Sequence, residues 1–117
     1  MHQTSLLIAD AHPIVRVGIR SLFSVHAAFR VAGEAATYDE VLRHCRAIRP
    51  DIVIVDLDLP ERGGLQTCRE IRAACARSRV VMFSACDDHR SMLAAMSAGA
   101  ERFVSKQESL DVLVEAA

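Results

Sequence analysis

The sequence lacks an excess of charge of either sign, because 14 Lys and Arg residues nearly balance 15 Asp and Glu residues. A face that binds nucleic acid or an anionic membrane carries a marked positive excess, and this composition indicates neither. No apolar run is long enough to span a bilayer, and residues 1–3 lead into a strand-like segment rather than a charged and apolar signal sequence. We therefore expect a cytoplasmic protein with no membrane contact and no DNA contact of its own.

Cysteine pairs of the C-x-x-C type are absent as well, as are internal repeats and low-complexity segments. The cysteines at positions 45, 68, 75 and 86 are therefore expected to be small buried or half-buried residues rather than metal ligands or disulfides. A length of 117 residues, 51% of them hydrophobic, suits one domain with a single core and leaves no room for a second domain.

The most informative stretch that is present runs from Asp51 to Pro60. Four consecutive apolar residues at 52–55 are typical of a strand that is buried on both faces of a sheet. The run stops at Asp56, and Asp58 follows two positions later. An aspartate there can simply begin a turn. It also places a carboxylate at the carboxyl end of a central strand, where open α/β sheets bind ligands.

Strand-like and helix-like segments alternate along the chain. Strands are predicted at 5–9, 29–35, 52–55, 79–83 and 101–105. The first helix begins at Pro13, which suits a first helical position, and has a broad apolar face that includes Ile14 and Val17 and extends to about Val25. A capping box formed by Thr37 and Glu40 begins the second helix, which extends to about residue 49.

Three more helices are predicted in the second half of the chain. The third covers 65 to about 76, and the fourth is capped by Asp87 or Asp88 and closed by Gly99. The last is capped by Ser109, begins at Leu110 and is still continuing at residue 117, so we expect that the domain is cut within or just after it. Five strands alternating with five helices predict an α/β fold, a doubly wound parallel sheet with helices on both faces.

Polar side chains follow four of these strands. Because parallel strands end at the same edge of a sheet, Asp10, Asp56, Ser84 and Lys106 are expected to converge there. Two carboxylates can hold a hard divalent cation such as Mg²⁺. A phosphoryl group on Asp56 would be neutralised by that cation and by the Lys106 ammonium, with a hydrogen bond from the Ser84 hydroxyl. Carboxylate attack on phosphorus gives an acyl phosphate.

The sequence resembles the receiver domain of bacterial two-component response regulators, most closely the NarL/FixJ (LuxR-type) branch, over essentially its whole length. The motifs that carry the resemblance are Ile8-Ala-Asp-Ala-His-Pro13, Asp56-Leu-Asp-Leu-Pro60 with Gly64, Ser84-Ala85 and Phe103-Val-Ser-Lys106. The resemblance implies a flavodoxin-like five-stranded sheet of order 2-1-3-4-5. It also implies a phosphorylation switch that accepts its phosphoryl group from a sensor histidine kinase and is not a turnover enzyme.

The same resemblance assigns roles to individual residues. Asp56 would be the phosphoacceptor, Lys106 the phosphate-binding lysine, and Ser84 and Phe103 the switch residues. Asp10, Asp56 and the backbone carbonyl of Asp58 would bind Mg²⁺. Phosphorylation would control a possible homodimer through the surface of the fourth helix, fifth strand and fifth helix, and a downstream helix-turn-helix DNA-binding domain that regulates transcription.

The sequence departs from the family's pattern at the metal site. The family usually has two consecutive acids before His-Pro, whereas Ala11 follows Asp10 here, so one direct carboxylate ligand is missing. Weaker Mg²⁺ binding is therefore expected, with the Asp58 carboxylate as a partial replacement. Gln107 stands where the wider family often has Pro, a difference without expected consequence.

Two alternatives remain beside this interpretation. The first is a pseudo-receiver, a protein-interaction module that has lost phosphate control, and Ala11 favours it. The second is a haloacid-dehalogenase-like phosphatase, because Asp56, Asp58, Ser84 and Lys106 also mimic the motifs of that enzyme class. The βαβα unit before Asp56 and the absence of room for a substrate-selecting cap argue against the enzyme.

Overall fold

The computed structural model describes residues 3–86, 88–106 and 111–117. Strands and helices alternate through these residues in the expected order. The strands are β1 (Thr4–Ala9), β2 (Phe29–Ala35), β3 (Ile52–Asp56), β4 (Arg79–Ser84) and β5 (Arg102–Ser105). The helices are α1 (Pro13–Ser24), α2 (Tyr38–Ile48), α3 (Gly63–Ala74), α4 (His89–Ser97) and α5 (Asp111–Ala116).

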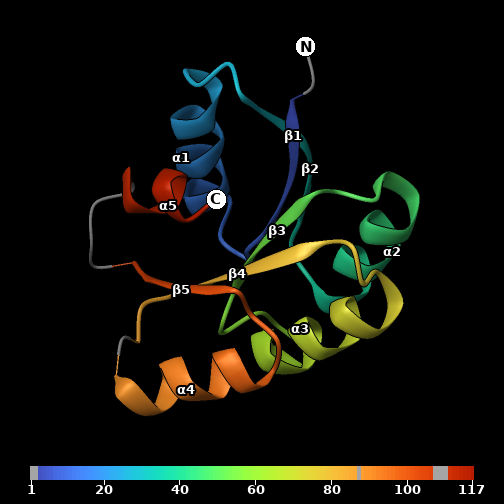
Figure 1. Ribbon diagram of the computed structural model, residues 1–117, viewed down its shortest axis with the longest axis vertical. Coiled ribbons are helices and arrows are strands. Elements are labelled where there is room, and N and C mark those ends of the chain that lie inside the picture. Colours follow the sequence, from blue (N-terminus) through green and yellow to red (C-terminus); the bar gives the residue numbers. More distant parts are fainter. Residues whose placement is uncertain (1–2, 87, 107–110) are drawn as a thin grey trace.

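The strands form one parallel sheet in the order β2-β1-β3-β4-β5 (Figure 1). This arrangement confirms the predicted flavodoxin-like, doubly wound fold. Every residue of β3 is buried, because the strand lies between β1 and β4 and is covered by helices on both faces. The apolar run at 52–55 therefore occupies the central position that its composition predicts.

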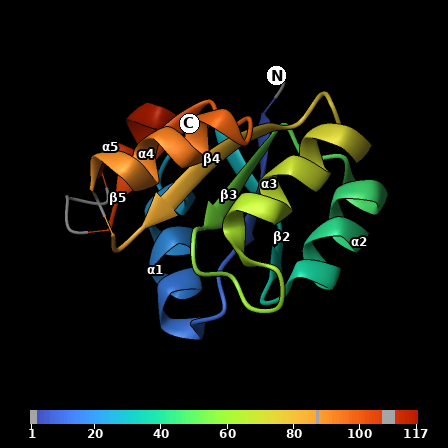
Figure 2. The same ribbon diagram turned by 90° about the horizontal axis from the view of Figure 1, so that it is seen from below.

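Two hydrophobic layers hold the sheet between its helices. Figures 1 and 2 show α1 and α5 on one face and α2, α3 and α4 on the other. On the first face, Ile19 and Phe23 of α1 pack with Leu113 of α5 over inward side chains of β1 and β3. On the second face, α2 and α3 pack over the alternate residues of the same strands. The period of two along each strand divides the core into these layers.

The predicted apolar face of α1 is only partly buried. Ile19 and Phe23 are 1% exposed, whereas Ile14 is 77% and Val17 is 56% exposed. Ile14 and Val17 lie three residues apart and share a side of the helix that faces away from the sheet. The broad apolar face predicted from the sequence is therefore only partly covered by the sheet.

The helix ends agree with the predictions in part. The Thr37 hydroxyl accepts a hydrogen bond from the Glu40 N–H at 3.3 Å, and the fourth helix is capped by Asp88, whose carboxylate accepts from the Ser91 N–H at 2.7 Å. Gly99 follows α4 with a φ of +108°, as expected of a residue that closes a helix. The third helix begins at Gly63, two residues earlier than predicted, and ends at Ala74. The predicted cap Ser109 and start Leu110 lie outside the described residues.

The four cysteines are free thiols in unlike surroundings. Cys45 and Cys68 are buried and Cys75 is half-buried, as expected, but Cys86 is exposed. The prediction fails for Cys86 because this residue lies in the loop between β4 and α4, not in the core. Burial, with the neighbouring Cys75 thiol, raises the pKa of Cys45 to about 12. None of the helices that the structure describes is long and apolar enough to cross a bilayer.

Candidate functional site

Asp56 is the last residue of β3 and is 2% exposed. Its Oδ1 atom accepts a hydrogen bond from the Asp58 N–H at 3.1 Å and lies 3.3 Å from the Lys106 Nζ atom. Its Oδ2 atom is buried and has no hydrogen-bond partner among the described residues. A buried carboxylate oxygen without a donor is costly, so its position indicates a ligand or a reacting group.

Asp10 follows β1 and is 1% exposed. Its Oδ2 atom accepts a hydrogen bond from Lys106 Nζ at 2.8 Å. Its Oδ1 atom accepts from the His12 backbone N–H at 2.8 Å and lies 2.9 Å from the His12 Nδ1 atom. Both oxygens of Asp10 therefore have partners, whereas only Oδ1 of Asp56 has one among the described residues.

Lys106 follows β5 and joins the two carboxylates. Its side chain is 18% exposed, and its ammonium lies 5.4 Å from the centre of the Phe83 ring. The Lys106 N–H donates to the Ser84 carbonyl at 2.7 Å, which extends the pairing of β5 with β4 by one residue. The lysine is thus fixed at both its backbone and its ammonium.

The charges in this cluster shift one another's pKa values. Burial raises the pKa of Asp56, and the Asp10 carboxylate adds to this effect against the opposing Asp58 N–H and Lys106. Burial would also raise the pKa of Asp10, but the hydrogen bonds from Lys106 and His12 outweigh it and leave that pKa below its usual value. Burial would lower the pKa of Lys106, and its two carboxylate partners raise it instead. The surroundings therefore favour the ionised forms of Asp10 and Lys106 and disfavour that of Asp56.

Ser84 lies at the end of β4, beside β3, and Phe103 lies on β5, beside β4. Ser84 ends β4 and is 0% exposed, and its Oγ atom accepts a hydrogen bond from the Cys86 N–H at 3.0 Å. Asp56 pairs across the sheet with Phe83, the residue before Ser84. Phe103 pairs with Met82 and packs half-buried against the core of the α2, α3 and α4 face. The structure thus brings Asp10, Asp56 and Lys106 into direct contact, with Ser84 at the next position of the neighbouring strand.

The loop from β3 to α3 passes over the end of the sheet. Asp58 is exposed there, and its N–H holds Asp56 Oδ1. Gly64 allows the loop to close, because a Cβ atom at this position would lie 2.6 Å from the Leu57 Cα atom and closer still to the Asp56 carbonyl oxygen. The Gly64 N–H donates to the Leu57 carbonyl at 2.8 Å. The close approach of these backbone atoms therefore explains why position 64 of the Asp56–Gly64 motif is a glycine.

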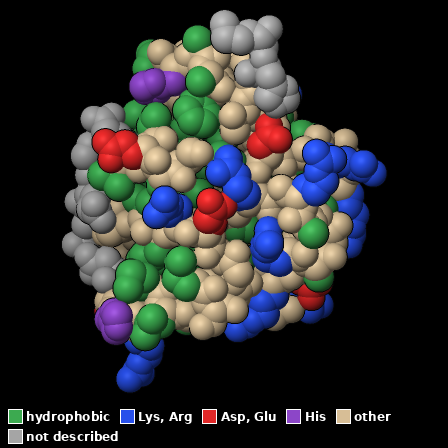
Figure 3. Space-filling model, viewed as in Figure 1, with side chains coloured by type: hydrophobic (Ala, Val, Ile, Leu, Met, Phe, Trp, Pro, Cys, Tyr) green, Lys and Arg blue, Asp and Glu red, His purple; other side chains and the backbone are tan. Residues whose placement is uncertain are grey.

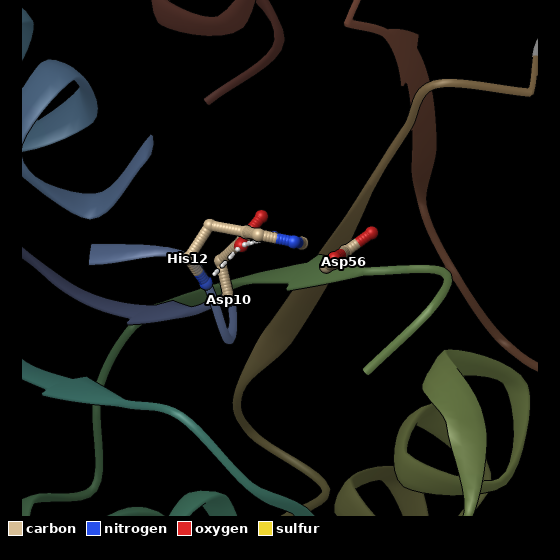
Figure 4. Close-up of side chains that lie close together, drawn as sticks. All are labelled: Asp10, His12 and Asp56. Carbon is tan, nitrogen blue, oxygen red and sulfur yellow. Dashed lines mark hydrogen bonds and ion pairs between the residues drawn. The ribbon is translucent and has the colours of Figure 1, made fainter. Parts of the chain in front are cut away.

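Asp10, His12 and Asp56 offer ligand atoms that all lie within 4.8 Å of one another (Figure 4). The two carboxylates, one of which has a buried oxygen without a partner among the described residues, fit a divalent cation. The strand-end pattern of the sequence predicts Asp10 and Asp56 here but gives His12 no role. Its position two residues after Asp10, before a helix that begins at Pro13, is the signal that could have indicated it.

The chain belongs to the response regulator receiver domain family, whose profile matches residues 6–117. It is similar to two-component regulators of the NarL and LuxR type. The nitrate/nitrite response regulator protein NarL of Escherichia coli K12 is 28% identical over 96% of this chain and 52% of its own length. The transcriptional regulatory protein YhcZ of Bacillus subtilis is 32% identical over 94% of this chain and 51% of its own length. The chain thus spans about half the length of these curated relatives.

Solved structures agree with this assignment. A LuxR-family response regulator from Aurantimonas sp. SI85-9A1 superposes with a TM-score of 0.92 and 35% identity, over 97% of this chain and 81% of that chain. The receiver domain of the putative response regulator NarL from Mycobacterium tuberculosis gives a TM-score of 0.90 and 26% identity, over 99% of this chain and 98% of that chain. Receiver domains are signalling proteins rather than turnover enzymes, so the family match speaks against the phosphatase alternative.

Proposed function

We propose that this domain is a phosphorylation switch that accepts a phosphoryl group on Asp56. The observation that carries the proposal is the Asp56 carboxylate itself, buried at the end of the central strand with Oδ2 unpartnered among the described residues and Lys106 and Asp10 beside it. Its membership of the receiver family supports the same role. A structural aspartate in such a place would have both oxygens satisfied.

The free oxygen is suited to be the nucleophile. Asp56 Oδ1 is held by the Asp58 N–H and by Lys106, so Oδ2 is the atom that attacks phosphorus. The new bond joins Oδ2 to phosphorus, and the bond from phosphorus to the donor, a phosphohistidine nitrogen or the acetate oxygen of acetyl phosphate, breaks. The Lys106 ammonium donates to the phosphoryl oxygens, and the Ser84 hydroxyl can turn from Cys86 to donate as well.

The carboxylates also account for a cation requirement. Asp10, Asp56 and the Asp58 backbone carbonyl would hold Mg²⁺, which supplies positive charge against the phosphoryl oxygens. Lys106 bridges Asp10 and Asp56 from the side of β5. The ammonium is therefore already positioned at the site of the transferred group.

A response to phosphorylation would pass from Ser84 to Phe103. Movement of the Ser84 hydroxyl toward the phosphoryl group would leave space that the half-buried Phe103 ring can enter. The neighbouring helix α4 exposes Met92, Leu93 and Met96, and Figure 3 shows hydrophobic side chains gathered over this helix at the lower left. This apolar surface favours a homodimer through α4, β5 and α5.

The relatives suggest the wider role. The partner that supplies the phosphoryl group would be a sensor histidine kinase, and the domain would control a helix-turn-helix DNA-binding domain that follows residue 117 in the parent protein. The lengths and names of NarL and YhcZ support a transcription regulator of this kind. The pseudo-receiver alternative is favoured by one observation, the absence of a carboxylate at Ala11.

Incubation with acetyl phosphate tests both possibilities. The domain should gain one acid-labile phosphate, measured by intact mass, at a rate that rises with Mg²⁺ concentration. Ala11→Asp should reach the same rate at lower Mg²⁺, because a third carboxylate attracts the cation, and Asp58→Asn should need more. A wild-type chain that gains no phosphate at any Mg²⁺ concentration, while Ala11→Asp does, would identify a pseudo-receiver.

A further inference from the structure

His12 is placed to act at the cation site. It lies in the loop between β1 and α1, and Figure 4 shows its side chain reaching past Asp10 toward Asp56. A ring nitrogen of His12 belongs to the group of three ligand atoms within 4.8 Å of one another. The other two come from Asp10 and Asp56, whose side chains are each 2% exposed, and the Asp56 Oδ2 atom has no hydrogen-bond partner among the described residues.

Two contacts with one oxygen of Asp10 place His12 here. The His12 backbone N–H donates to Asp10 Oδ1 at 2.8 Å, and Pro13 fixes the backbone that follows. The Nδ1 atom lies 2.9 Å from the same oxygen. With a proton on Nδ1, the ring donates to Asp10 and keeps a lone pair on its other nitrogen, the tautomer in which histidine binds metals.

The residue between Asp10 and His12 offers no ligand. Ala11 ends in a methyl group, so the side chains that can ligate a cation here, among the described residues, are two carboxylates and one imidazole, with the Lys106 ammonium beside the carboxylates. Mg²⁺ prefers oxygen ligands and binds imidazole poorly. First-row transition ions accept carboxylate and imidazole together, and their affinity for such sets exceeds that of purely oxygen-binding ions.

We propose that His12 is the third side-chain ligand of the cation held by Asp10 and Asp56, and that the site therefore selects a first-row transition ion, for which Mn²⁺ is the paramagnetic probe, over Mg²⁺. The inference rests on the proposed phosphoacceptor function, because it concerns the cation that this function uses. The exposure of the His12 side chain, 65%, lets the ring adjust to an ion without disturbing the core.

Mn²⁺ binding by electron paramagnetic resonance, with Mg²⁺ as competitor, tests the proposal without any phosphoryl transfer. The wild-type chain should prefer Mn²⁺ over Mg²⁺, and His12→Ala should weaken Mn²⁺ binding by about tenfold or more, the scale on which groups around a metal act. The same substitution should leave Mg²⁺ affinity within about twofold, since imidazole contributes little to Mg²⁺ binding. His26→Ala removes an exposed histidine from the loop after α1 and is the matched control, with no expected change.

Pulsed spectra supply an independent readout. Coupling of bound Mn²⁺ to an imidazole nitrogen should be present in the wild type and in His26→Ala and absent in His12→Ala. His12→Asn, which offers an amide oxygen, should lose the nitrogen coupling and shift the preference toward Mg²⁺. If the wild type shows no nitrogen coupling, or if His12→Ala changes Mn²⁺ and Mg²⁺ affinity equally, His12 is not a ligand and the proposal is wrong.

Failure of the inference and failure of the proposed function give different results. Phosphate uptake from acetyl phosphate without any Mn²⁺ preference would overturn the role of His12 and leave the function of Asp56 intact. A nitrogen-coupled Mn²⁺ site in a chain that takes up no phosphate would support the role of His12 and overturn the proposed function.

Discussion

Asp51 and Asp56 stand at opposite ends of β3, and their surroundings differ in what they leave unsatisfied. Asp51 Oδ2 accepts hydrogen bonds from the Ser5 N–H at 2.8 Å and the Ser5 hydroxyl at 3.1 Å, and the Asp51 N–H donates back to Ser5 Oγ at 3.0 Å. At the other end, Asp56 has one oxygen with donors and one buried oxygen with none among the described residues. Asp51 thus joins β1 to β3 at one edge of the sheet, here called the closed edge. At the other edge, here called the open edge, Asp56 has an oxygen available for a ligand or a reacting group.

The difference indicates where the fold carries a stability cost. Ser5 and Asp51 tie β1 to the start of β3, an arrangement that stabilises the parallel pairing of the two strands. Around Asp56, burial and a second carboxylate act against the ionised form. A destabilising arrangement held in place by the rest of the fold is typical of a functional site.

The strongest test of the comparison is phosphate uptake. Asp56→Asn should abolish the acid-labile phosphate gained from acetyl phosphate, because the carboxamide cannot form the acyl phosphate. Asp51→Asn should retain uptake at the wild-type extent, since Asp51 lies at the far end of the strand. Intact mass before and after acid treatment measures both, and uptake by Asp56→Asn would show that another residue is the acceptor.

Backbone packing behind Asp56 should be sensitive to a single methyl group. Gly64→Ala would place a Cβ atom against the Leu57 Cα atom and the Asp56 carbonyl oxygen, and neither backbone atom can move without shifting the end of β3. We expect the free energy of unfolding to fall by about 1–3 kcal/mol, which is the usual cost of overpacking. Chemical denaturation followed by circular dichroism measures this change.

Gly33→Ala is the control for this prediction. Its Cβ atom would meet the Ile48 Cδ1 atom at 3.0 Å, the end of a flexible side chain that can move. The free energy of unfolding should therefore fall less in Gly33→Ala than in Gly64→Ala. Equal losses for the two variants would mean that the close approach at Gly64 does not decide the position of Asp56.

Much of the fold can be predicted because buried segments and helix ends have characteristic residue patterns. The apolar run at 52–55, the alternation of strands with helices and the proline and capping residues at helix starts all reflect local requirements. The exposure of Ile14 and Val17 could not be predicted, because an apolar pattern on a helix does not say how much of it the neighbouring elements will cover. The prediction for Cys86 is wrong for a similar reason, since its burial depends on the path of a loop.

The site is predictable to the extent that strand ends determine it. The rule that parallel strands end at one edge is enough to bring Asp10, Asp56 and Lys106 together. Loop conformation decides the finer contacts, and these could not be predicted. They include the closer approach of Lys106 to Asp10, at 2.8 Å, than to Asp56, at 3.3 Å, and the position of His12 beside Asp10.

The closed edge of the sheet should lose stability when Asp51 is truncated. Asp51→Ala would leave the Ser5 N–H and hydroxyl without their acceptor in a position where Ser5 is 7% exposed. We expect the free energy of unfolding to fall by about 1–3 kcal/mol, the cost of unsatisfied buried donors. Asp51→Asn keeps an acceptor oxygen and should lose less in the same denaturation experiment. An unchanged stability in Asp51→Ala would mean that water replaces the carboxylate without cost.

The open edge should respond in the opposite direction when Asp56 is neutralised in cation-free protein. Asp56→Asn removes the charge that burial and Asp10 disfavour, while Lys106 keeps its 2.8 Å bond to Asp10. We expect the free energy of unfolding at neutral pH to rise by about 1 kcal/mol, the low end of the cost of an unsatisfied buried polar group.

The pH dependence gives this last prediction its sign. The pKa of Asp56 is higher in the folded chain than in the unfolded chain, so the folded state binds the proton more tightly, and the wild type loses this stabilisation as pH rises through the raised pKa. The gain in the free energy of unfolding of Asp56→Asn over the wild type should be full above the raised pKa and should shrink toward about pH 4, near the ordinary value for aspartate.

Denaturation of both chains in a chelator at several pH values measures this difference. Added Mg²⁺ or Mn²⁺ should narrow the gap at neutral pH by stabilising only the chain with the intact carboxylate. A variant that is less stable than the wild type at neutral pH in the chelator would mean that the Lys106 contact outweighs the buried charge.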